Sequence, residues 1–379
     1  MWIRTEECSG CGACAAACPK GCITMKPDSE GFLYPQIDAA QCVDCHRCEQ
    51  ACPVHQGVLL FDETKAIAAQ NQNDSIRQAS SSGGVFTALA ERILEDGGVV
   101  CAAAYDDSFA VIHKITHQPE HLSAFRGAKY TQSHSGHLFG EIKTLLGADT
   151  PVMFVGTPCQ CAGLWRYLGK KPENLLLVDM VCHGVPSPKV WQRYLDLRRS
   201  VDGKIGAINL RNKATGWSRY AYSVEIRHEN GTVYSVPQGQ DPFMRGFTSD
   251  LYLRPSCSHC SFKGYVRCTD LTLGDCWGIW ELMPEFDDNK GTSLLLIHST
   301  KGQEMWQSIC GDFHYVELDE EPALRHNSSA LNSSTAHPKR QEFFQKLDSQ
   351  PLDSLIWQCI QPPAPRQSLL KRIYHRLRR

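Results

Sequence analysis

The sequences CSGCGACAAACP, residues 8–19, and CVDCHRCEQACP, residues 42–53, decide how the first part of this chain folds. Both have the spacing C-x2-C-x2-C-x3-C-P, in which three cysteines follow one another closely and a fourth stands beside a proline. The first residues contain no apolar segment typical of a secretory signal, so we expect a cytoplasmic protein with reduced thiols. In such a protein, a high density of cysteines indicates metal binding.

This spacing is typical of bacterial ferredoxins with two clusters, where the fourth cysteine of each run binds the cluster of the other run. We therefore predict two 4Fe-4S clusters, the first bound by Cys8, Cys11, Cys14 and Cys52, and the second by Cys42, Cys45, Cys48 and Cys18. The alternative is a pair of zinc sites, but zinc binding gives no reason for the C-P ending to occur twice. Cys22 lies outside the pattern, and we expect it to be a packed thiol.

The rest of the 379-residue chain alternates between short apolar runs and helical patterns, which indicates an α/β core. A hairpin is expected at 23–38, and Asn230-Gly231 predicts a second hairpin and thus an antiparallel C-terminal portion. The other expected strands are 66–70, 98–105, 151–155, 174–181, 270–280 and 292–299, and the expected helices are 82–98, one beginning near Cys159 and one capped by Ser187. The fold class is therefore α/β and α+β, with a dicluster ferredoxin domain at 1–60, a mixed core in two parts at 61–150 and 151–347, and a tail at 348–379.

Charge provides little information about partners. Lys and Arg number 39 against 41 Asp and Glu, so nothing suggests binding to nucleic acid. The tail is basic, and on a helix its apolar residues share one face. We expect either a peripheral contact with a membrane or a protein, or a solvated terminal segment.

Four further cysteines predict a third metal site. Cys159 and Cys182 each follow an expected strand, at the sheet edge where α/β proteins bind ligands. Cys257 and Cys260 form another C-x2-C pair. Taken singly, these residues could be buried thiols, a nucleophile or half a zinc site, but together they favour a third iron–sulfur cluster. His183, next to Cys182, is a candidate catalytic proton donor, and a structural histidine is the alternative.

Two polar stretches are candidate anion sites. Ser81, Ser82, Gly83 and Gly84 precede an expected helix, whose first amides and dipole favour a phosphate; the alternative is a simple helix cap made by the serines. The loop FRGAKYTQS, residues 125–133, carries Arg126 and Lys129 with no nearby acid. Such a loop suits a pyrophosphate, although it could also be only a solvated loop.

Several motifs together resemble the family formed by the beta subunits of coenzyme F-420 hydrogenases and dehydrogenases, in its bacterial branch with a fused ferredoxin domain. In chain order, these motifs are SSGG (81–84), FRGAKYTQS (125–133), GTPCQ (156–160), CHGVPSP (182–188), DLTLGDCWG (270–278) and DNKGTSLLLI (288–297). The resemblance implies a flavoprotein that holds FAD beside an iron–sulfur cluster. It implies that the flavin is bound by Ser81, Ser82, Gly83, Gly84, Arg126, Gly127, Lys129, Tyr130 and Ser133. Cys161 and Cys276 depart from the family pattern, where apolar residues are expected.

We therefore expect an oxidoreductase that depends on FAD and 4Fe-4S clusters. A flavin can exchange one or two electrons, so it would connect one-electron clusters with a hydride carrier. The expected partners are a ferredoxin or other redox protein and a small organic substrate or deazaflavin coenzyme. The alternative is an electron-transfer subunit that docks onto a separate catalytic partner.

Overall fold

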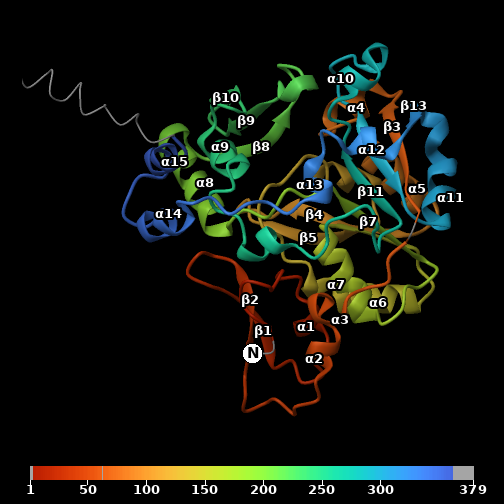
Figure 1. The fold of residues 1–379 in the computed structure, drawn as a ribbon, viewed down its shortest axis with the longest axis vertical. Helices are drawn as coiled ribbons and strands as arrows, with labels where there is room; N and C mark the ends of the chain where they lie inside the picture. The colour runs from red at the N-terminus through yellow and green to blue at the C-terminus, as the bar shows by residue number, and fades with distance from the viewer. Residues whose placement is uncertain (1–2, 62, 362–379) are drawn as a thin grey trace, which may run out of the picture.

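The computed structural model describes residues 3–61 and 63–361 (Figure 1). The N-terminal part is a small lobe built around the hairpin of β1 (Ile23–Pro27) and β2 (Leu33–Ile37), which pair antiparallel as the sequence predicts. Its helices are α1 (Ala13–Ala16), α2 (Arg47–Gln50) and α3 (Pro53–Gln56). The carboxylate of Asp28 accepts hydrogen bonds from the amides of Glu30 and Phe32 and so closes the hairpin turn.

An eight-stranded mixed sheet forms the centre of the molecule, with the strand order β13-β3-β12-β11-β7-β6-β4-β5. Strands β4, β6, β7 and β11 run parallel to one another, whereas β5, β12 and β13 pair antiparallel with their neighbours. Their bounds are β3 Lys65–Asn71, β4 Val99–Tyr105, β5 Val111–Thr116, β6 Val152–Gly156, β7 Leu175–Met180, β11 Leu271–Asp275, β12 Ser293–Ile297 and β13 Phe313–Leu318. The mixed α/β class is confirmed.

Helices cover both faces of this sheet, which is why its central strands are apolar on both sides. Helices α5 (Val85–Glu95) and α11 (Thr300–Ile309) pack on one face against Met153, Leu176 and their neighbours. Helices α6 (Phe139–Gly147) and α7 (Pro158–Leu168) pack on the other face (Figure 1). Cys11 and Ala13 of the small lobe join this second core, so the lobe rests directly on the helix that begins at Pro158.

A second, antiparallel sheet has the order β10-β9-β8, and its core is shared with α8 and α9 as well as with α14 and α15 near the end of the described residues. Its strands are β8 Ile205–Asn212, β9 Ser223–His228 and β10 Val233–Pro237. The remaining helices are α4 Asp74–Ala79, α8 Pro188–Asp202, α9 Pro242–Thr248, α10 Ile279–Leu282, α12 Glu320–Leu324, α13 Ser328–Leu331, α14 Arg340–Lys346 and α15 Leu352–Ile360. Short 3-10 helices lie at Pro119–Ala124, Gly136–Leu138, Ser218–Tyr220, Pro255–His259, Pro284–Phe286 and Cys310–Asp312.

Two local predictions are wrong. The expected serine cap before α5 does not form, because the helix begins after Gly84, which has φ 96° and makes no side-chain cap. The expected strand at 270–280 ends at Asp275, because Gly278 with φ 87° begins helix α10. The hairpin at Asn230-Gly231 and the Ser187 cap, which accepts from the amide of Val190, are confirmed.

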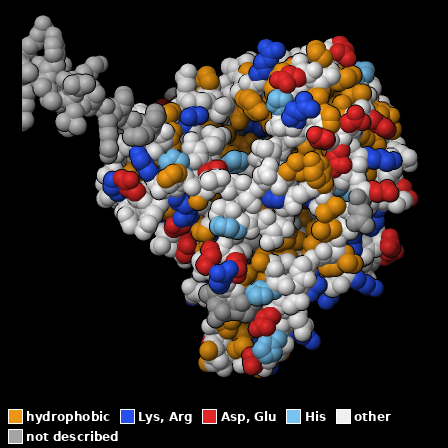
Figure 2. Space-filling model, in the orientation of Figure 1, with side chains coloured by type: hydrophobic (Ala, Val, Ile, Leu, Met, Phe, Trp, Pro, Cys, Tyr) orange, Lys and Arg blue, Asp and Glu red, His pale blue; other side chains and the backbone are white. Residues whose placement is uncertain are grey.

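The surface carries both signs of charge, and Figure 2 shows Lys and Arg interspersed with Asp and Glu over the visible face. No helix within 3–61 or 63–361 has the length and apolar character needed to cross a bilayer. Of the predicted basic tail, residues 362–379 lie outside the described residues.

Candidate functional site

The structure gathers the first predicted cluster set in the small lobe. Cys8, Cys11, Cys14 and Cys52 are all buried, and Cys52 stands at the start of α3. Burial, together with the neighbouring Cys8 and Cys52, raises the pKa of the Cys14 thiol to about 12. The fourth cysteine of the second run therefore lies with the first run, as the crossed ferredoxin pattern predicts.

The second set surrounds a cavity at the outer end of the lobe. This cavity has about 510 Å³ of empty space and is lined by Cys18, Cys42, Cys45 and Cys48. Cys42 and Cys45 are exposed. The same cavity is also lined by Cys22, whose sulfur lies 3.3 Å from that of Cys18. Cys22 is buried and packs with Cys14 and Ile23, in agreement with the prediction of a packed thiol. The ferredoxin spacing did not predict that it also lines this cavity.

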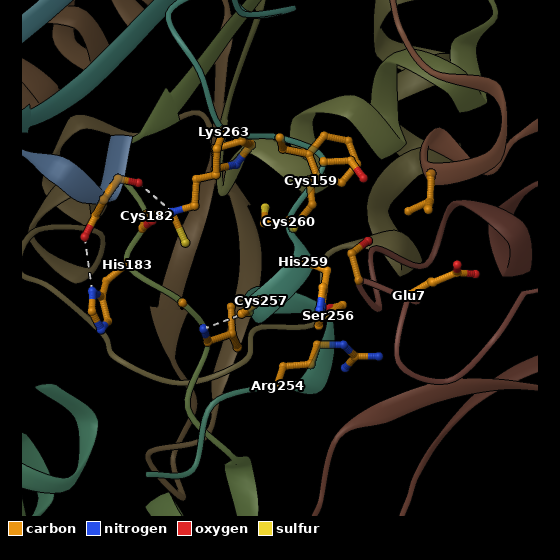
Figure 3. Close-up of a pocket in the computed structure, with 18 of the residues that line it drawn as sticks. Glu7, Cys159, Cys182, His183, Arg254, Ser256, Cys257, His259, Cys260 and Lys263 are labelled. Atoms are coloured by element: carbon orange, nitrogen blue, oxygen red, sulfur yellow. Dashed lines mark hydrogen bonds between the residues drawn. The ribbon is translucent and has the colours of Figure 1, made fainter. Parts of the chain in front are cut away.

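A cavity at the third predicted site, called the third cavity below, brings together all four cysteines of that set. It has about 590 Å³ of empty space and is lined by Cys159, Cys182, Cys257 and Cys260 (Figure 3). Cys159 lies in the first turn of α7, fixed by a capping box between Thr157 and Gln160. Cys182 follows β7, which runs parallel to β6, so the two cysteines share one sheet edge. The Cys257 pair arrives from a distant loop around the 3-10 helix Pro255–His259.

The electrostatics of the third cavity suit an anionic metal–thiolate group. Burial raises the pKa of Cys159, Cys182 and Cys257 to about 12, so these thiols are protonated unless a metal binds them. Two cations line the same cavity and partly offset this effect of burial. Arg254 lowers the pKa of Cys159, and Lys263 lowers the pKa of Cys182. Within the described ranges, no three His, Cys, Asp or Glu side chains are placed to hold a single metal ion. Four thiols around one cavity are the donor set that a 4Fe-4S cluster requires.

The first and third sites are neighbours. Glu7, Ser9 and Val54 of the small lobe line the third cavity, and Cys159 lies near enough to Cys11 to help raise the pKa of the Cys11 thiol. A Cβ added to Gly163 of α7 would stand 2.9 Å from the Cys11 sulfur, so glycine allows this close approach. Buried Arg254 donates to the carbonyl of Cys8 at 2.7 Å and ties the two sites together.

The two predicted anion stretches also meet. Gly83 donates its amide to Ser293 Oγ at 2.9 Å, and Arg126 donates to Thr87 Oγ1 at 3.1 Å in the first turn of α5. The Arg126 guanidinium thus lies at the helix start that follows Ser81–Gly84. Ser82 donates to the carbonyl of Thr292. The buried Ser81 hydroxyl has no hydrogen-bond partner within the described residues. A bound ligand could supply that partner.

Two other predicted flavin contacts, Lys129 and Ser133, make hydrogen bonds to other residues of the protein. Lys129 donates to the carbonyls of Phe125, Arg126 and Gly127, and burial lowers its pKa to about 7. The hydroxyl of Ser133 meets His113 at 2.5 Å, and Gln160 donates to the Ser133 carbonyl at 3.1 Å. These residues therefore hold the loop in place.

Sequence reasoning missed Arg211 and Asp275. Arg211 is buried, and its Nη1 donates to Asp275 at 2.8 Å and to the Tyr130 hydroxyl at 3.2 Å. Its Nε and Nη2, like Asp275 Oδ1, are buried with no partner among the described residues. Asp275 pairs with Ser293, the residue that receives the Gly83 amide, so this pair lies beside Ser81–Gly84. The only signal in the sequence was that Asp275 belongs to the DLTLGDCWG motif (270–278); nothing in the sequence singled out Arg211.

His183 lines the third cavity (Figure 3), but both of its ring nitrogens are engaged. Nε2 meets Asp250 at 2.5 Å and Nδ1 meets Ser329 at 3.1 Å. Cys161 and Cys276 are fully buried and do not line this cavity, so the two departures from the family pattern are packed thiols.

Comparison with known proteins gives three matches to sequence families. Residues 66–138 match the N-terminal part of the beta subunit of coenzyme F420 hydrogenase/dehydrogenase, and residues 149–321 match the C terminus of the same beta subunit. Residues 7–56 match a 4Fe-4S dicluster domain.

Among individual proteins, the chain is 27% identical over 193 residues to the F component of the F(420)H(2) dehydrogenase of Methanosarcina mazei, covering 48% of this chain and 54% of that protein. It is 33% identical over 96 residues to the isethionate sulfite-lyase activating enzyme of Desulfovibrio desulfuricans, covering 24% of this chain and 29% of that enzyme. The chain thus spans about half the length of the first relative and less of the second.

A solved structure of the F420-reducing [NiFe] hydrogenase complex from Methanosarcina barkeri aligns with a TM-score of 0.48 and 17% identity, over 72% of this chain and 91% of that chain. The sequence matches cover most of the chain in consecutive order, with the dicluster domain before the two parts of the beta subunit. This protein therefore belongs to the family of coenzyme F420 hydrogenase/dehydrogenase beta subunits and carries an N-terminal 4Fe-4S dicluster domain.

Proposed function

We propose that this protein is an iron–sulfur flavoprotein oxidoreductase that moves electrons between one-electron clusters and a two-electron carrier or organic substrate. The observation that carries the proposal is the convergence of Cys159, Cys182, Cys257 and Cys260 on one cavity beside the first ferredoxin site. Electrons would enter at the exposed second site, pass the first site and reach the third. A deazaflavin such as coenzyme F420 is one candidate carrier, because F420 appears in the family name.

The flavin proposal is supported by unpartnered polar atoms at the sheet edge. Ser81 Oγ, two nitrogens of Arg211 and one oxygen of Asp275 are buried there without partners among the described residues. Ser81–Gly84 and Arg126 would hold the pyrophosphate of FAD, because helix amides and a guanidinium favour that dianion. When bound, FAD would supply the exchange between one-electron and two-electron chemistry.

The protein's own side chains would position the bound ligand and the cysteines of the third site. Arg211 and Tyr130, linked by a 3.2 Å hydrogen bond, would present donors to a planar polar ligand. Thr157 and Gln160 hold the first turn of α7 and thereby orient Cys159. His183, held by Asp250 and Ser329, is better suited to fixing the cavity wall than to releasing a proton.

Replacing Arg126 with Ala tests the flavin site. The variant loses a charge-assisted contact worth about 1.5 to 3 kcal/mol, so FAD should bind about 10- to 100-fold more weakly while the iron content stays unchanged. Bound flavin is measured by absorbance after denaturation, and affinity by fluorescence titration.

Arg92→Ala is the matched control, because Arg92 lies on α5 but pairs with Asp96 at the surface near the end of the helix. This control should retain wild-type FAD affinity. Equal affinity in Arg126→Ala and the wild type contradicts the proposed flavin site, and a wild-type protein that binds no flavin contradicts the flavoprotein proposal.

A second candidate function is an electron-transfer subunit without its own substrate. It is favoured by the exposure of Cys42 and Cys45, which lets a redox partner approach the second cluster. The purified chain, loaded with FAD and clusters, distinguishes the two. Reoxidation of its flavin by a deazaflavin or organic acceptor alone supports the oxidoreductase, whereas activity only with an added partner protein supports the electron-transfer role.

A further inference from the structure

The second ferredoxin site contains five thiols, although a 4Fe-4S cluster needs four protein ligands. Cys18, Cys42, Cys45 and Cys48 follow the predicted pattern, and Cys22 lines the same cavity beside them. Cys22 is 6% exposed, and its sulfur lies 3.3 Å from that of Cys18. The extra thiol is therefore in direct contact with a ligand of the cluster.

Local backbone structure explains this proximity. Residues 18–21 form a tight turn in which the Gly21 amide donates to the Cys18 carbonyl at 3.1 Å, with Gly21 at φ 61°. The turn brings Cys22, the residue that follows it, next to Cys18, with which the turn begins. The Cys22 backbone is held at the end of the hairpin, because its carbonyl accepts from the Asp38 amide at 2.8 Å. Cys22 is thus fixed in place toward the cavity.

The first site offers a contrast within the same chain. Cys52 occupies the position that corresponds to Cys18, as the cysteine before proline, and the residue four positions later is Gln56. Glutamine is a poor ligand for iron in a cluster, which prefers thiolates. The fifth thiol is therefore a feature of the second site, which is also the site with exposed cysteines.

We propose that Cys22 is a reserve ligand of the second 4Fe-4S cluster and can take the place of Cys18 on the iron. In this exchange the bond between iron and the Cys18 sulfur breaks and a bond to the Cys22 sulfur forms. The proton of the Cys22 thiol passes to the Cys18 thiolate, and no oxidation state changes.

Iron content after anaerobic reconstitution tests this assignment, which rests on the dicluster domain and not on the proposed function. Cys18→Ala should retain the wild-type iron and sulfide content, because Cys22 completes the cluster. Cys22→Ala should also retain it. The double variant Cys18→Ala/Cys22→Ala should lose about four irons, the content of one cubane. Low-temperature electron paramagnetic resonance of the reduced proteins identifies which cluster is present.

Cys52→Ala is the matched control, and it should lose about four irons because position 56 supplies no thiol. The proposal is overturned if Cys18→Ala loses as many irons as the double variant. If Cys18→Ala cannot be purified, the rate of cluster loss in ferricyanide decides between the outcomes. Cys22→Ala should then lose the second cluster several-fold faster than the wild type, and equal rates overturn the proposal.

Discussion

His113 connects three parts of the core through one buried ring. Its Nδ1 meets Ser133 at 2.5 Å, its Nε2 meets the carbonyl of Val155 at 2.9 Å, and the ring stacks on Phe154. Burial lowers the pKa of His113 to about 4, and the Val155 carbonyl only partly offsets this. The ring is therefore neutral at physiological pH, and its charging opposes folding.

The lowered pKa of His113 predicts that the fold loses stability in acid. Because the neutral form is favoured in the fold, the contribution of His113 is complete above pH 6.5 and is lost as the pH falls from 6.5 toward 4. Between pH 7.5 and pH 5, the loss should be about 2 kcal/mol. The measurement is the free energy of urea unfolding at the two pH values, and His113→Gln should show a pH dependence smaller by about that amount. His117, an exposed neighbour, is the control, and His117→Gln should keep the wild-type dependence.

Single cysteines also define the third site. Cys182→Ser should lose about four of about twelve irons and leave the ferredoxin signals intact, because Cys182 lines only the third cavity. Cys310→Ser should retain all the iron, since Cys310 lies in the short 3-10 helix Cys310–Asp312 and lines neither of the two cavities. Iron analysis of the reconstituted proteins measures both. Full iron in Cys182→Ser would remove the third cluster from the proposal.

Helix α5 depends on a close approach of its start to the sheet. A Cβ built on Gly83 would stand 2.1 Å from the Ala69 carbonyl oxygen and 2.6 Å from the Ser293 nitrogen, which are both backbone atoms. Backbone cannot move aside as a flexible side chain can. Glycine at position 83 therefore sets how α5 meets β3 and β12, and through them the position of the proposed phosphate site.

Gly83→Ala should lower the free energy of unfolding by about 1 to 3 kcal/mol through overpacking. It should also weaken FAD binding, because the start of α5 is displaced. Gly147→Ala, at the end of α6, is the control, since a Cβ there meets nothing within 4 Å and alanine favours a helix by up to about 1 kcal/mol. Chemical denaturation measures both variants. Equal stability of Gly83→Ala and the wild type would show that the helix start can shift freely.

Across the whole molecule, Arg254 joins the small lobe to the core. It is 2% exposed, donates to the carbonyls of Cys8 and Leu33, and lies over the ring of Tyr34 at 4.2 Å. Arg166 makes a second connection by donating to the carbonyl of Gln50, but it does so near the surface. A buried, multiply bonded arginine leaves unsatisfied carbonyls when it is removed, whereas an exposed one is replaced by water.

Arg254→Ala should therefore loosen the lobe. Protease cleavage between α3 and β3 should become several-fold faster than in the wild type, because the lobe separates from the core more often. Arg166→Ala should stay close to the wild-type rate. Limited proteolysis under anaerobic conditions measures all three proteins, and identical rates for both variants would rule out Arg254 as the main connection.

The sequence by itself predicted the small lobe, the mixed core and the three sets of cysteines. Cysteine spacing is local information, since each run must wrap one cluster, and strand and helix patterns reflect which faces are buried. The helix start at Gly84 and the early end of β11 were missed, because positive φ values and tertiary packing override local propensity.

Outside the predicted sets, only the tertiary structure decided which groups meet. The gathering of Cys257 and Cys260 with Cys159 and Cys182 follows the prediction from the sequence. The pairing of the buried Arg211 with Asp275 and the contact of Cys22 with Cys18 do not, and only the packed chain decided them. It also turned Lys129 and Ser133 inward, where their polar atoms satisfy the protein's own loop. The physical reason is that a buried polar group takes whichever partner the packed chain brings within hydrogen-bond distance, and sequence spacing does not encode that distance.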